Sequence, residues 1–172
     1  MLGLLALRLS RDLWLNLGRV VEKMLKKIPH ESAIDVLARF DLTEEAAALA
    51  SDIRFDQLAP ADAIKFFVDN AQYLDALNFI AHGLTVREGI WWGVRCIRDS
   101  KIPWTENELG LLDLCDAWIK SADEDARRSI DLLAEEQGLQ RPPSFLGKAI
   151  FLCCAGSIGL PDGPPVAPDP DL

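Results

Sequence analysis

Three pairs of residues spaced as Ser/Thr-x-x-Glu constrain the fold of this chain more than any other feature. In such a capping box the hydroxyl accepts a hydrogen bond from the first turn of a helix, while the glutamate reaches back to the capping residue. Each pair here precedes a run with apolar residues at helical spacing. The sequence therefore predicts helix starts directly after the three caps. The pairs are Thr85 with Glu88, Thr105 with Glu108, and Ser121 with Glu124.

The rest of the chain has helical patterns of the same kind and lacks strand patterns. No stretch sustains an alternation of apolar and polar residues with β-branched enrichment, and no Asn-Gly hairpin turn occurs. We expect an all-α single domain of about eight or nine short helices that pack as antiparallel hairpins, because the connections are short. A solenoid-like stack and an irregular bundle both remain open. The predicted helices span residues 10–28, 32–39, 43–51, 60–70, 72–82, 86–99, 106–120, 122–137 and 143–155.

Charge and proline content divide the 172 residues into three predicted segments. Residues 1–30 form a basic amphipathic helical segment. Its first 27 residues carry six basic and two acidic side chains, a net +4, which leaves −13 for the rest of a chain whose net charge is −9. Residues 31–157 form the helical domain. Residues 158–172 form a tail with five of the ten prolines, for which we expect an extended, exposed conformation.

The most unusual stretch is GIWWGVRC, residues 89–96. On a helix, the adjacent Trp91 and Trp92 point to different sides, and two glycines four residues apart allow another helix to approach closely. We interpret this helix as central, and predict that Trp91, Trp92, Cys96 and Trp118 belong to the structural core. The alternative is a small-molecule or catalytic pocket formed by Trp91, Trp92, Cys96 and His82.

Residue patterns that would indicate catalysis or metal binding are scarce. The two histidines have no ligand spacing to each other or to the four cysteines, and no motif for a serine nucleophile, a phosphate loop or a zinc protease occurs. The cysteines do not form a disulfide framework, which favours a cytoplasmic setting. The acidic balance argues against nucleic-acid binding. We expect no catalytic residues, no cofactor and no metal, hence a protein that is not an enzyme.

Four segments, in order, resemble an uncharacterised bacterial family of unknown function. They are AIDVLARFDLTEEAAALA, YLDALNFIAHGLTVREGIWWGVRCIR, LCDAWIKSADEDARRSIDLLAEE and AIFLCCAGSIGLPDGPPVAPDPDL. The resemblance covers roughly residues 33–172, and its most specific parts are the Trp-Trp-x-x-x-Cys element and the proline ending. Genes of that family often lie in or near type VI secretion clusters. The resemblance thus implies an accessory or adaptor role without known enzyme activity.

These observations together predict a protein-interaction module that docks secretion-apparatus components through the two ends of the chain. A proline-rich segment suits recognition because it loses little entropy when it binds. The alternative for the basic first segment, residues 1–28, is contact with an anionic membrane surface, such as the inner membrane. The candidate partner-binding residues are Leu4, Leu5, Leu7 and Trp14 in the first segment, and Pro164, Pro165, Pro168 and Pro170 in the tail.

Overall fold

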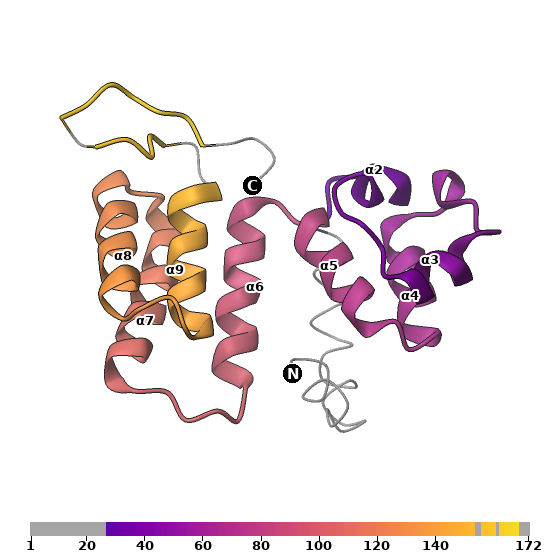
Figure 1. Ribbon diagram of the computed structural model, residues 1–172, viewed down its shortest axis with the longest axis horizontal. Helices are drawn as coiled ribbons and strands as arrows, with labels where there is room; N and C mark the ends of the chain where they lie inside the picture. The colour runs from indigo at the N-terminus through magenta and orange to yellow at the C-terminus, as the bar shows by residue number, and fades with distance from the viewer. Residues whose placement is uncertain (1–26, 154–155, 161, 169–172) are drawn as a thin grey trace. The chain divides into compact units, whose positions relative to one another are not determined.

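The computed structural model describes residues 27–153, 156–160 and 162–168, and the regular structure in these ranges is entirely helical (Figure 1). The predicted all-α class is confirmed. The contacts divide the chain into two compact units, Met1–Thr85 and Val86–Leu172. The boundary lies inside the predicted 31–157 domain. The predicted helix 10–28 lies outside the described residues except for its last two positions.

The first unit is built from short helices around an aromatic core. Phe67 lies at its centre: its ring centroid is 5.8 Å from that of Phe55 and 6.1 Å from that of Phe79. All three rings are buried, and burial of such large apolar surfaces is the main stabilising contribution to a small unit. The helices are α2 (Ala33–Leu37), α3 (Glu44–Ala50), the 3-10 turn η2 (Phe55–Gln57), α4 (Pro60–Asp69) and α5 (Tyr73–Gly83).

A buried carboxylate joins two helices of this unit. Asp75, 1% exposed on α5, accepts hydrogen bonds from both the backbone N–H and the hydroxyl of Thr43, each at 2.9 Å. The Thr43 hydroxyl in turn caps α3 by accepting from the backbone N–H of Ala46. A buried charge of this kind is tolerated because hydrogen bonds replace its lost hydration. Asp75 therefore fixes where α3 begins against α5.

The second unit is a bundle of four helices that lie side by side (Figure 1). They are α6 (Val86–Asp99), α7 (Glu106–Ser121), α8 (Glu124–Glu136) and α9 (Pro142–Cys153). Consecutive helices pack together as the short connections predict. In addition α9 packs against α6 and α7. Because the last helix returns to the first, this unit is a closed bundle, and the solenoid-like alternative does not describe it.

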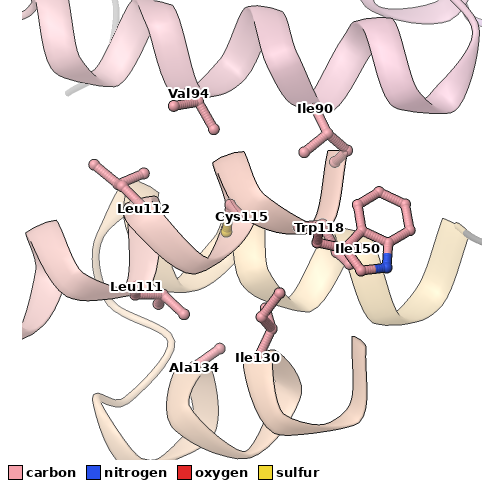
Figure 2. Packing of buried hydrophobic residues seen from close by; sticks show 9 residues of the cluster. All are labelled: Ile90, Val94, Leu111, Leu112, Cys115, Trp118, Ile130, Ala134 and Ile150. Carbon is pink, nitrogen blue, oxygen red and sulfur yellow. The ribbon is translucent and has the colours of Figure 1, made fainter. Parts of the chain in front are cut away.

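Side chains from all four helices meet in one core (Figure 2). Small residues set how closely the helices approach. A Cβ at Gly93 of α6 would lie 2.8 Å from the Leu146 side chain of α9, and one at Gly147 would lie 3.0 Å from Ala134 of α8. The expectation that a glycine of the Trp-Trp stretch admits another helix is thus correct for Gly93, and its neighbour is α9. The core residues are Ile90, Val94, Leu111, Leu112, Cys115, Trp118, Ile130, Ala134 and Ile150.

One predicted capping box is present and another is replaced. Thr105 and Glu108 form the complete reciprocal box at the start of α7. The start of α8 differs, because Asp123 rather than Ser121 is the cap and accepts from the backbone N–H of Ala126 at 2.8 Å. Ser121 is instead the last residue of α7. The prediction of a capping box at Ser121 is wrong because only two residues, Ala122 and Asp123, separate the helices.

Candidate functional site

The candidate site is the segment that follows α9, here called the C-terminal loop and defined as the described residues 156–160 and 162–168. It holds three of the predicted partner-binding residues. Pro164 and Pro165 are exposed and Pro168 is half-buried. Leu4, Leu5, Leu7, Trp14 and Pro170 lie outside the described residues. The loop is drawn in yellow beyond α9 in Figure 1.

Arg127 of α8 is the residue that anchors this loop. Its side chain is only 2% exposed, and it donates to the backbone carbonyl oxygens of Phe151 in α9 and Ser157 in the loop. The guanidinium carbon also lies 4.6 Å from the centroid of the Phe151 ring. A buried guanidinium needs many partners because its desolvation is costly. Arg127 therefore links α8, α9 and the loop through one planar group.

Glu124 and Arg128 complete the anchor at the start of α8. The Arg127 Nε lies 2.6 Å from the Glu124 carboxylate, and the Arg128 Nε lies 2.9 Å from it. Hydrogen bonding from Arg127 is the largest effect that holds the pKa of Glu124 below its usual value. Arg128 donates to the carbonyl oxygens of Gly159 and Ser157 at 3.0 and 2.9 Å. Two guanidinium groups thus converge on the first residues of the loop.

The i, i+4 spacing of Asp123 and Arg127 in the sequence is typical of an exposed ion pair on a helix surface. Asp123 is the helix cap, and Arg127 pairs with Glu124 instead. One feature of the sequence points to burial: Arg127 precedes Ile130 by three residues and Ala134 by seven, the spacing of one helical stripe. Ile130 and Ala134 are core residues. The charge of Arg127 suggests an exposed side chain, whereas its helical spacing from two core residues indicates that it faces the interior.

The tryptophan pair does not occupy the centre of the bundle. Trp91 and Trp92 are both half-buried, whereas Ile90 and Val94 supply the buried face of α6. Cys96 is exposed, so the prediction that it belongs to the core is wrong. The reason is that α6 buries only the side facing α7 and α9, and Cys96 lies on another side. Trp118 is 4% exposed and packs in the core.

His82 does not form a nucleophilic pair within its unit with Cys96 or Cys115, the two cysteines whose side chains the structure describes. His82 belongs to the first unit, where its ring stacks on Phe40 with centroids 5.3 Å apart. Cys96 and Cys115 belong to the second unit. Desolvation raises the pKa of the buried Cys115 thiol to about 12. Cys115 is therefore a protonated thiol at neutral pH, which is the weakly nucleophilic form.

A shallow hollow of about 610 Å³ lies beside η2 and α4, and its charged rim includes Arg54, Asp62 and Lys65. The residues that the structure describes include no group of three or more His, Cys, Asp or Glu side chains placed to hold a metal ion. Among the same residues, no helix has the length and apolar character required to cross a bilayer.

The sequence matches the model of one protein family. No curated protein and no solved structure matches the chain. The model of a family of unknown function, DUF6931, matches residues 63–172. This match covers more than half of the chain and includes all of the second unit with its C-terminal loop. The chain therefore belongs to the family DUF6931.

Proposed function

We propose that the protein is a non-enzymatic interaction module that acts as an adaptor accessory to a bacterial type VI secretion apparatus. The observation that carries the proposal is the anchored C-terminal loop, which holds exposed Leu160, Pro164 and Pro165 on an ordered backbone. Leu160 is 80% exposed, and a large apolar side chain held in water at a fixed place is typical of a binding element. The secretion setting comes from the resemblance of the sequence to a family found in such gene clusters.

The mechanism that fits these features is docking, with no chemical step. A loop ordered before binding loses less conformational entropy on association than a free segment does. The basic first segment, with Leu4, Leu5, Leu7 and Trp14, is the second proposed contact, since its +4 charge and apolar residues suit an acidic partner surface. The cytoplasm is the proposed compartment, because the partners in this scheme are the cytoplasmic parts of the apparatus.

Quantitative affinity capture from a bacterium that carries the gene tests the proposal. The tagged chain is compared with Leu160→Asp, with a form lacking residues 1–30, and with Leu132→Asp as a matched control. Leu132 is 62% exposed on α8 and lies outside the loop. We expect secretion-apparatus components to be enriched by the wild-type chain and by Leu132→Asp, and to be depleted when either end is altered. Enrichment of no such component, or identical partners with both ends altered, would reject the proposal.

A further inference from the structure

The C-terminal loop is closed on itself by backbone hydrogen bonds. The N–H of Ile158 donates to the carbonyl of Val166 at 2.8 Å, and the N–H of Gly163 donates to the carbonyl of Leu160 at 3.0 Å. The hydroxyl of Ser157 accepts from the N–H groups of Gly159 and Val166 at 3.1 and 2.9 Å. The residues at the two ends of the loop therefore lie side by side, with a turn between them. Over the described residues of the predicted tail, 158–160 and 162–168, the chain thus folds back into a loop, whereas its prolines predict an extended conformation.

Backbone contacts require a glycine at one position of the loop, Gly159. A Cβ at Gly159 would lie 2.9 Å from the backbone carbonyl oxygen of Pro164, and one at Gly156 would lie 2.6 Å from the guanidinium of Arg127. Contacts below 3.0 Å with backbone cannot be relieved by a side-chain movement. At Gly163, by contrast, a Cβ would meet its nearest atom at 3.5 Å, an ordinary contact. Closure of the loop therefore requires glycine at position 159, whereas a Cβ at Gly163 is compatible with the closed loop.

The surface that the loop presents is apolar and acidic. Its exposed side chains include Leu160, Pro164, Pro165 and Val166, with Asp162 at the turn. The sequence from residue 149 to residue 172 contains three aspartates and no lysine or arginine. The nearest cations of α8, Arg127 and Arg128, are engaged with Glu124 and with loop carbonyls. Within the described residues of this unit, a partner therefore meets apolar groups and the Asp162 carboxylate, while the two neighbouring guanidinium groups of α8 are already paired.

We propose that the C-terminal loop is a preformed ligand for a shallow groove on another protein, a groove lined by aromatic side chains and bordered by lysine or arginine. Proline rings and Leu160 suit flat aromatic surfaces, and the exposed Asp162 carboxylate suits a basic rim. Glu124, Arg127 and Arg128 are positioning residues in this scheme, because they hold the loop and do not touch the partner. The inference rests on the proposed function and specifies the chemistry of the partner.

Site-specific photo-crosslinking in the native host tests the inference. The probe is a benzoylphenylalanine in place of Leu160, with the same group in place of Leu132 as the control position. We expect the Leu160 position to crosslink to peptides that contain aromatic residues beside lysine or arginine, with a yield that falls as salt concentration rises. Crosslinks to acidic peptides without aromatic residues, to a second copy of this chain, or equally from both positions would overturn it.

Alanine substitutions at Gly159 and Gly163 test whether closure of the loop is needed for partner binding. In the probe-bearing chain, Gly159→Ala should lower the crosslink yield roughly tenfold, because an opened loop loses its preorganisation, whereas Gly163→Ala should leave the yield close to that of the parent. Equal yields from the two variants would overturn the preformed-ligand idea. If the Leu160 position captures nothing while the tagged chain still enriches secretion components, this inference fails and the proposed function stands. If the tagged chain enriches no partner, both fail.

Discussion

At the scale of single residues, Arg127 has the most varied set of contacts in the second unit. Its side chain is 2% exposed. The guanidinium forms an ion pair with a carboxylate, lies over an aromatic ring and donates hydrogen bonds to the backbone carbonyls of two segments. A methionine has a similar length and suits the apolar surroundings, but it donates no hydrogen bond. The Phe151 carbonyl would then lose its Arg127 donor and Glu124 its closest cation, while the Ser157 carbonyl would keep the hydrogen bond from Arg128.

We therefore expect Arg127→Met to lower the free energy of unfolding by about 2–4 kcal/mol. Arg128→Ala should cost about 1 kcal/mol or less, because its ion pair is partly exposed, with the Arg128 side chain 24% and the Glu124 side chain 49% exposed. Urea unfolding followed by circular dichroism measures both. A cost for Arg127→Met no larger than that for Arg128→Ala would show that the anchor is not the structural link inferred from its contacts.

At the scale of elements, the α7–α8 connection is short because one residue adopts an unusual backbone conformation. Ala122 follows α7 with φ of 51°, in the left-handed region. An L-residue with a Cβ is disfavoured there by roughly 1–2 kcal/mol, whereas glycine is not. The next residue, Asp123, already caps α8. A two-residue connection between the two helices is thus achieved with local strain.

Replacement of Ala122 by glycine should therefore stabilise the protein by about 0.5–1 kcal/mol, after the larger entropy of glycine in the unfolded chain is deducted. The control is Ala117→Gly, at an exposed position inside α7, which should destabilise by about 1 kcal/mol because glycine is a poor helix former. Thermal unfolding of the two variants gives the comparison. A lower melting temperature for both would refute the strain at Ala122.

The capping box of α7 makes stability depend on pH. The Thr105 backbone N–H donates to the Glu108 carboxylate at 2.7 Å, and this bond is the largest effect that lowers the pKa of Glu108, with Arg141 contributing less. Because the folded-state pKa lies below the unfolded value of about 4.5, the stabilisation is fully present above pH 4.5. It is lost as the pH falls through the folded-state pKa.

Glu108→Gln removes this titration. We expect the variant to melt at a lower temperature than the wild type at pH 7, and the difference to shrink as the pH is lowered below about 4.5. Melting curves from pH 7 to pH 3 provide the measurement, with Glu106→Gln, at an exposed first-turn position, as the control. A difference that is constant across this range would mean that Glu108 does not stabilise the folded state as a carboxylate.

Local sequence patterns predicted these elements well and their environments less well. Helix boundaries at α4 to α9 agree with the predicted ranges within about two residues, because caps and apolar periodicity act within one or two turns. The exposure of Cys96 and the burial of Arg127 were missed, since each depends on which helices pack beside that position. The candidate loop was located by its prolines, but its closure through Ser157 and Gly159 depends on contacts that composition does not encode.

At the scale of the whole molecule, the division into two units implies that the second unit can fold alone. Its core residues all lie between Ile90 and Ile150, and the anchor of the C-terminal loop lies within the same unit. A bundle with its own core, about 85 residues long, is within the size range of independent domains. The family match also covers the whole unit.

We expect a fragment of residues 86–172 to be helical and to unfold cooperatively when heated, as monitored by circular dichroism. In this fragment Leu112→Ala should cost about 2–5 kcal/mol, because Leu112 is fully buried in the core, whereas Leu132→Ala at an exposed position should be nearly neutral. A fragment that melts without a transition, or that tolerates both changes equally, would show that the four helices need the first unit to form a packed core. If the fragment folds, its loop can be studied without the basic first segment, so that the two proposed partner contacts are separated experimentally.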